Sequence, residues 1–129
     1  MNLSNCSKVI ASLKGSLGAN TSLEILSIWK VDVESFPDEG FLPLSLTSLD
    51  INCCTNLKKL NYKGLSHLLS LEKLKLQSCG NLQGLPDEGL PKSISNLVIM
   101  DCAKLKKRCE KPGGEDWRKI AHIKNLGIY

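Results

Sequence analysis

The stretch that decides the fold is residues 71–89, LEKLKLQSCGNLQGLPDEG. Its apolar positions are Leu71, Leu74, Leu76, Cys79, Leu82 and Leu85. The same pattern recurs 25 residues earlier, at Leu46, Leu49, Ile51, Cys54, Leu57 and Leu60. It recurs again 23 residues later, at Ile94, Leu97, Ile99, Cys102 and Leu105. A pattern with a period of about 20 to 29 residues indicates a solenoid of stacked repeats.

The spacing within one repeat predicts its local structure. Leu74 and Leu76 alternate with residues of the opposite face, which is the period of a short strand with one buried face. Leu82 and Leu85 then bring the chain back across the interior. One repeat cannot bury these side chains alone, so neighbouring repeats stack and their strands pair in parallel. The sequence therefore predicts an α/β fold, a leucine-rich-repeat solenoid shaped as a right-handed horseshoe with a parallel concave β-sheet.

The whole chain of 129 residues is predicted to be a single leucine-rich-repeat domain of about four to five short repeats. Leu3, Cys6 and Val9 match the later positions of the pattern, so we expect a solenoid that is truncated at the N-terminus. The predicted units are a partial repeat at 1–20, repeats at 21–45, 46–69, 70–92 and 93–111, and a C-terminal cap helix with a last strand at 112–129.

Three helical segments are expected between the strands. Apolar spacing predicts a helix over residues 10–17 and a helical turn over residues 65–70. Glu115 and Asp116 fit the first turn of a short helix that continues to Ala121, where carboxylates favour the positive end of the helix dipole.

The C-terminal tail is expected to close the solenoid. Trp117 and His122 are interpreted as residues that pack the tail against the preceding repeat. Ile123, Leu126 and Ile128 reproduce the spacing of the earlier strands and predict a last edge strand.

Composition and charge narrow the class of protein. A net charge of +4 without a nucleic-acid-binding motif leads us to expect no nucleic-acid partner. The basic cluster of Lys104, Lys106, Lys107, Arg108 and Lys111 is interpreted as a solvated loop. No apolar run approaches the length of about 18 residues that a membrane span needs, and the first residues do not resemble a signal peptide. We therefore expect no membrane span and a cytoplasmic or nuclear location.

The six cysteines are expected to be reduced. Cys54, Cys79 and Cys102 recur at the repeat spacing, and Cys6 falls in the same register. This predicts a ladder of buried thiols at repeat positions rather than disulfide bridges. The sequence contains no Cys-x-x-Cys pair, so we expect no zinc site.

The C-terminal sequence carries a more specific resemblance. Residues 108–123, RCEKPGGEDWRKIAHI, closely resemble the C-terminal end of plant intracellular nucleotide-binding leucine-rich-repeat disease-resistance proteins of the coiled-coil class. Residues 85–97, LPDEGLPKSISNL, resemble their penultimate repeat. The chain departs from the family in having Thr55, Gly80 and Ala103 after the repeat cysteines, where the family often has proline.

The resemblance implies a role in recognition. In the family the terminal repeats contribute to pathogen-effector recognition and hold the nucleotide-binding domain inactive. The implied partners are therefore proteins, namely a pathogen effector or guarded host protein and the nucleotide-binding domain of the parent receptor. The sequence contains no Gly-x-x-x-x-Gly-Lys-Ser/Thr phosphate loop, so no nucleotide or other cofactor is expected in this chain.

The candidate site is the face that the strands turn away from the core. Each strand contributes three intervening residues. They are Ile25, Ser27 and Trp29, then Ser48, Asp50 and Asn52, then Lys73, Lys75 and Gln77, and finally Asn96, Val98 and Met100. Aromatic and basic residues beside apolar ones are typical of protein-binding hot spots, whereas the alternative is an ordinary solvated sheet.

No catalytic function is expected. The nearest approach to a hydrolase motif, Gly64–Leu68, lacks the second glycine of a nucleophile elbow. The sequence thus favours the recognition and regulatory repeats of a plant immune receptor, acting in defence without chemistry of their own. The alternative is a freestanding repeat scaffold or adaptor that joins proteins without a nucleotide switch.

Overall fold

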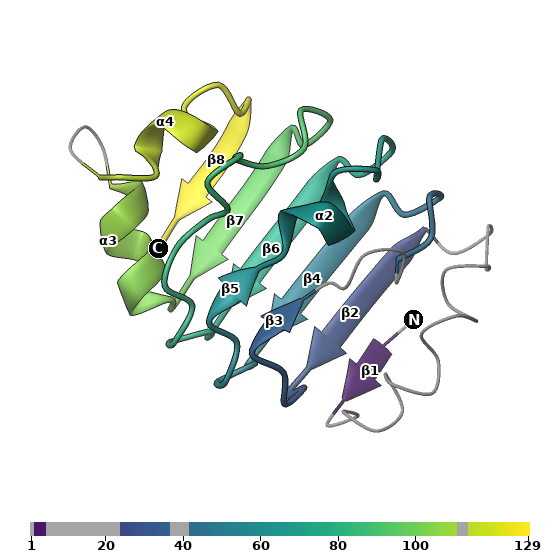
Figure 1. The fold of residues 1–129 in the computed structure, drawn as a ribbon, viewed down its shortest axis with the longest axis horizontal. Coiled ribbons are helices and arrows are strands. Elements are labelled where there is room, and N and C mark those ends of the chain that lie inside the picture. The colour runs from purple at the N-terminus through teal and green to yellow at the C-terminus, as the bar shows by residue number, and fades with distance from the viewer. Residues whose placement is uncertain (1, 5–23, 37–41, 111–113) are drawn as a thin grey trace.

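Short parallel strands organise the computed structural model of the chain, which describes residues 2–4, 24–36, 42–110 and 114–129 (Figure 1). The strands are β1 (Asn2–Ser4), β2 (Ile25–Trp29), β3 (Ser35–Phe36), β4 (Ser48–Asn52), β5 (Lys59–Leu60), β6 (Lys73–Gln77), β7 (Asn96–Met100) and β8 (Asn125–Ile128). The helices are α2 (Tyr62–Leu65), α3 (Ala103–Cys109) and α4 (Trp117–Ile120).

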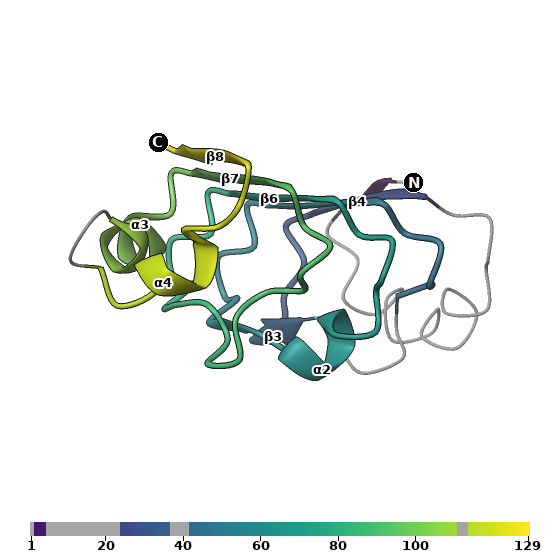
Figure 2. The same ribbon diagram turned by 90° about the horizontal axis from the view of Figure 1, so that it is seen from above.

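The described residues form one six-stranded sheet in the order β1-β2-β4-β6-β7-β8, and every neighbouring pair is parallel. Figure 1 shows these strands side by side in chain order. Seen from above in Figure 2, the sheet makes one layer, and the helices and returning loops lie together on one side of it. The predicted α/β class with a parallel sheet is confirmed.

The core consists of two rows of aliphatic side chains that run across the sheet. The register aligns Leu26, Leu49, Leu74 and Leu97 in one row and Ile28, Ile51, Leu76 and Ile99 in the other. All eight are 0% exposed. Burying one such side chain contributes about 1.5 to 3 kcal/mol, and the repeated spacing places one beside the next. The alternation predicted from the sequence is therefore confirmed for β2, β4, β6 and β7.

A second, smaller ladder lies behind the main sheet. There β3 pairs in parallel with β5, and the Asn61 amide donates to the Phe36 carbonyl at 2.9 Å. One unit later, the Gln83 amide donates to the Lys58 carbonyl at 2.9 Å. We call this series, from β3 through β5 to the loop at Leu85, the back ladder.

The chain leaves each of the central strands in the same way. Lys30, Cys53, Ser78 and Asp101 directly follow these strands, and all have φ between 51° and 55°. The left-handed conformation turns the next residue inward. That residue is Val31 after β2 and is a cysteine in the following three units.

The predicted thiol ladder is confirmed for Cys54, Cys79 and Cys102, which are free and 0% exposed. The Cys79 thiol donates to the Gln77 carbonyl at 3.4 Å, so the thiol occupies the turn that ends the strand. Hydrogen bonds with the neighbouring thiols and burial raise the pKa of Cys79. Cys6 lies outside the described residues.

One helical prediction needs correction. Helix α2 begins at Tyr62 rather than Leu65, because the Asn61 side chain accepts a hydrogen bond from the Lys63 amide at 3.2 Å and caps the helix start. The helix predicted over residues 10–17 lies outside the described residues.

The basic cluster was wrongly predicted to be a loop. Most of it lies on α3, because Leu105 and Cys109 fall four residues apart and both are buried against the core. Lys104, Lys106 and Lys107 occupy the exposed side of that helix, whereas Arg108 is half-buried. Lys111 lies outside the described residues.

The tail follows the prediction only in part. Strand β8 pairs with β7, and Trp117 packs half-buried against the core, as predicted. His122 is exposed, so its predicted packing role is wrong. Asp116 precedes α4 instead of lying in its first turn, because its carboxylate is held inside the molecule.

Candidate protein-interaction face

The twelve predicted site residues form three rows across the sheet, on the side opposite the returning loops. We call this side the outer face. The first row is Ile25, Ser48, Lys73 and Asn96; the second is Ser27, Asp50, Lys75 and Val98; the third is Trp29, Asn52, Gln77 and Met100. Parallel pairing at matched register brings residues together that are 23 to 25 positions apart in the chain.

Strand β2 supplies the apolar end of the outer face. Ile25 is 58% exposed and Trp29 is 39% exposed, although Leu26 and Ile28, on the inner face of the same strand, are fully buried. Large apolar side chains on a regular strand cost solubility unless another surface covers them, so they are suited to protein contacts.

The middle of the outer face is polar. The Ser27 hydroxyl donates to Asp50 Oδ2 at 3.4 Å, which fixes the direction of that carboxylate. Asp50 Oδ1 is shielded from solvent and accepts no hydrogen bond from any described residue. Lys75 is the register neighbour of Asp50 on β6, and Lys73 stands exposed in the first row. Strand β6 therefore adds two cationic side chains next to a single carboxylate.

Asn52 differs from the other eleven predicted residues. It is 2% exposed, and its side-chain amide donates to the Ile28 carbonyl at 3.5 Å. Asn52 therefore offers almost no exposed surface to a partner, because its amide joins β4 to β2, and its role in binding stays a prediction. The exposed ring of Trp29 is its register neighbour.

The outer face also includes residues of β8, which are not among the twelve predicted site residues. Strand β8 sets Asn125 beside Asn96 and Gly127 beside Val98. A side chain at Gly127 would meet the Tyr129 ring at 2.8 Å, so the glycine lets this exposed tyrosine fold over the strand. Asn125 and Gly127 alternate with Leu126 and Ile128. The spacing that predicted the last strand therefore already indicated these added positions.

A shallow cavity of about 540 Å³ adjoins the third row where β6 and β7 end. Its lining includes Gln77, Met100, Tyr129 and Lys106. Two predicted site residues thus border a hollow that Lys106 of α3 also lines. This arrangement can accommodate a side chain of a partner protein.

The described part of the chain contains no group of three His, Cys, Asp or Glu residues arranged to hold a metal ion. Burial raises the pKa of the Cys109 thiol to about 12, which keeps this cysteine protonated. Within the same residues, no helix has the length and apolar character that crossing a membrane requires.

Comparison with known proteins gives two similarities. The chain is 38% identical over 105 residues to a protein of Arabidopsis thaliana named as a disease resistance protein; the match covers 80% of this chain and 7% of that protein. It is 49% identical over 53 residues to a protein of Solanum bulbocastanum named as disease resistance protein RGA4, covering 40% of this chain and 5% of the relative. No family model and no solved structure matches. The similarities confirm the predicted resemblance.

Proposed function

This chain is related in sequence to plant disease resistance proteins, and from that relationship we propose that it forms a block of leucine-rich repeats in a plant immune receptor. The chain spans only 7% and 5% of the two relatives. The repeated register and the back ladder support a right-handed horseshoe whose parallel sheet is its concave side.

The proposed activity is recognition of protein without catalysis. The outer face is the binding surface, and its partners are a pathogen effector or guarded host protein and the nucleotide-binding domain of the parent receptor. Binding the first promotes a defence response, whereas contact with the second holds the receptor inactive. The proposed site of action is the cytoplasm or nucleus, and the chain itself needs no cofactor.

The observation that carries this proposal is the contrast within single strands. On β2, Leu26 and Ile28 are fully buried, yet Trp29 on the same five-residue strand is exposed. On β6, the buried Leu74 and Leu76 alternate with Lys73 and Lys75. Residues that the fold does not need for its core are thus brought together as one apolar and cationic surface, which suits a protein partner.

The test uses the outer face against a matched surface. The chain is joined to one half of a split luciferase, and the nucleotide-binding segment encoded upstream in the same transcript is joined to the other half. Both are expressed in leaf cells. The variant Trp29→Ala/Lys73→Glu/Lys75→Glu is expected to lose the signal. Lys107→Glu/Arg118→Glu, on exposed positions of α3 and α4, is the control and is expected to retain it. Equal signals from both variants overturn the proposal.

The alternative function is a freestanding scaffold that joins proteins without a nucleotide switch. This function needs only the parallel sheet and its outer face. Sequencing the full transcript separates the two functions. A Gly-x-x-x-x-Gly-Lys-Ser/Thr motif upstream in the same reading frame supports the receptor, and a stop codon directly upstream of Met1 in that frame supports the scaffold.

A further inference from the structure

The back ladder changes its chemistry at Leu85. In the earlier units its bonds are between backbones, as in the donation from the Asn61 amide to the Phe36 carbonyl. Pro86 stands one residue after Leu85, as Asn61 stands one residue after Leu60. Because proline has no amide hydrogen, that ladder bond cannot be repeated in this unit.

The next unit cannot continue the ladder either. Arg108 stands nine residues after Ile99, as Leu85 stands nine residues after Leu76. That position lies within α3 and carries a charged side chain, and its carbonyl accepts from the Asp116 amide at 2.7 Å. Leu85 therefore needs other partners, since it is 5% exposed and unpaired buried backbone groups are costly.

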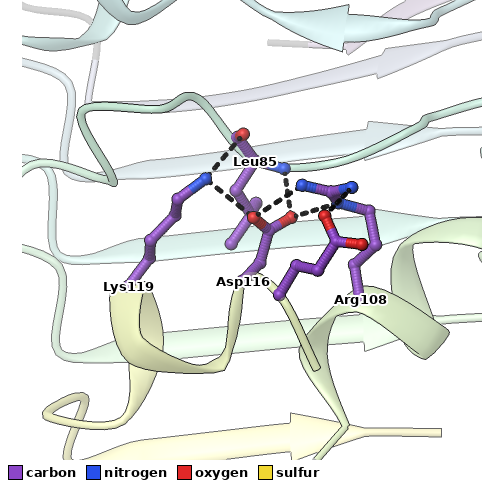
Figure 3. A network of polar contacts seen from close by, with 5 residues as sticks. Leu85, Arg108, Asp116 and Lys119 are labelled. Atoms are coloured by element: carbon purple, nitrogen blue, oxygen red, sulfur yellow. Dashed lines mark hydrogen bonds and ion pairs between the residues drawn. The ribbon is translucent and has the colours of Figure 1, made fainter. Parts of the chain in front are cut away.

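Two side chains from the C-terminal segment supply those partners. The Leu85 amide donates to Asp116 Oδ2 at 2.9 Å, and the Leu85 carbonyl accepts from the Lys119 ammonium at 3.3 Å. Figure 3 shows both side chains reaching the backbone of Leu85 from the region of α4. One carboxylate and one ammonium thus stand where a neighbouring strand would place a carbonyl and an amide.

The carboxylate is itself held by two cations. Arg108 donates to both oxygens of Asp116, at 2.9 Å and 3.2 Å, and Lys119 donates to Oδ1 at 2.7 Å. The Asp116 side chain is 0% exposed, so this charge has no water to solvate it. Burial raises the pKa of Asp116, but the hydrogen bonds from Arg108, Lys119 and Leu85 outweigh burial and leave it below its ordinary value.

The local sequence makes room for this contact. A side chain at Gly84 would stand 2.5 Å from Arg108 Nε and 3.0 Å from Asp116 Oδ2. Glycine directly before Leu85 therefore lets the charged pair approach the loop. The contact with Leu85 therefore depends on four residues. Gly84 leaves space for it, Pro86 removes a ladder bond, and Asp116 and Lys119 supply the replacing bonds.

We propose that Asp116 and Lys119 form a side-chain cap that ends the back ladder at Leu85 and fastens residues 103–110 and 114–129 to the preceding unit. With the cap closed, β8 is held against β7 and the outer face is complete. When the cap is lost, α4 and β8 open together while β4 and β6 stay closed. This conformational device is independent of the partner that the outer face binds.

Hydrogen–deuterium exchange of the full chain tests the cap. In Asp116→Asn, the amides of residues 114–128 are expected to exchange about tenfold or more faster, because charged hydrogen bonds are lost, while those of β4 and β6 change little. Glu115→Gln is the matched control, since Glu115 bonds Arg108 at 2.8 Å but is 76% exposed and is expected to change exchange little. Uniform acceleration across all strands, or none, overturns the proposal.

The unmodified chain gives a second measurement that does not depend on a variant folding. If the cap joins the two parts, the Leu85 amide becomes accessible only when the C-terminal segment opens. Leu85 and the β8 amides are then expected to show the same free energy of opening, lower than that of β6. A Leu85 amide that exchanges much faster than β8 contradicts the cap.

Discussion

The two faces of the main sheet are built from the same strands and follow opposite rules. The inner face has the same kind of residue at each matched position, since Leu74 and its register neighbours are fully buried in every central unit. The outer face changes from Trp29 to Asp50 to Lys75 without altering the strand pairing. The fold therefore constrains one face and leaves the other free to vary, and recognition by such a protein is expected to depend on the face that the fold does not constrain.

The largest expected effect tests the inner face. Leu74→Ala or Leu97→Ala is expected to lower the free energy of unfolding by about 2 to 5 kcal/mol, because each side chain is fully buried and leaves a cavity between two neighbours. Denaturant titration followed by circular dichroism measures the loss. A loss near zero at both positions would contradict the assignment of this face to the core.

A buried charge should behave unlike a buried leucine. The lowered pKa of Asp116 means that its contribution to the free energy of unfolding, about 1.5 to 3 kcal/mol, is present above the ordinary pKa of about 3.9. It is lost as the pH falls through the lower value in the folded protein. Melts from pH 7 to pH 2 should show a steeper acid loss in the native chain than in Asp116→Asn; parallel curves would exclude the linkage.

Asn52 tests the boundary between the two faces. It was assigned to the outer face by its position, but it is buried and bonds the Ile28 carbonyl. Asn52→Ala is therefore expected to cost about 0.5 to 1.5 kcal/mol. Gln77→Ala, at the neighbouring position of β6, is the control and should cost less because that residue is half-buried without such a bond among the described residues. Equal costs would mean that the bond from Asn52 to the Ile28 carbonyl contributes nothing to stability.

At the residue that follows a strand, a substitution is expected to raise stability rather than lower it. Lys30 has φ of 52°, a conformation that costs a residue with a side chain about 1 to 2 kcal/mol. Lys30→Gly relieves this strain but adds freedom to the unfolded chain, so we expect a net gain of about 0.5 kcal/mol. Thermal melts measure the gain. Lys59→Gly, on β5, is the contrasting variant and is expected to lower stability.

The sequence predicted the inner face well because burial imposes a period on it. Leu49, Leu74 and Leu97 could be aligned from spacing alone, and the strands followed. It failed where a contact depends on residues far apart in the chain. The carboxylate of Asp116 accepts a hydrogen bond from the amide of Leu85, 31 residues away, and no local sequence pattern predicts such a pair.

The outer face shows the same limit. Alternation placed Asn52 outside with its neighbours, but only the structure shows its bond to the Ile28 carbonyl. The basic run at 104–108 read as a loop because its charges obscured the spacing of Leu105 and Cys109. These failures share a cause: polar side chains occur both solvated and paired with other groups, and periodicity does not distinguish the two states.

The smallest expected effect is the one that separates the faces most directly. Lys75→Ala should change the free energy of unfolding by less than about 0.5 kcal/mol, since Lys75 has no ion pair with any described residue and shares its strand with the buried Leu74. The same denaturant titration measures both variants. If Lys75→Ala costs as much as Leu74→Ala, the two faces are not distinct; if it costs almost nothing yet weakens partner binding, the outer face acts in recognition and not in folding.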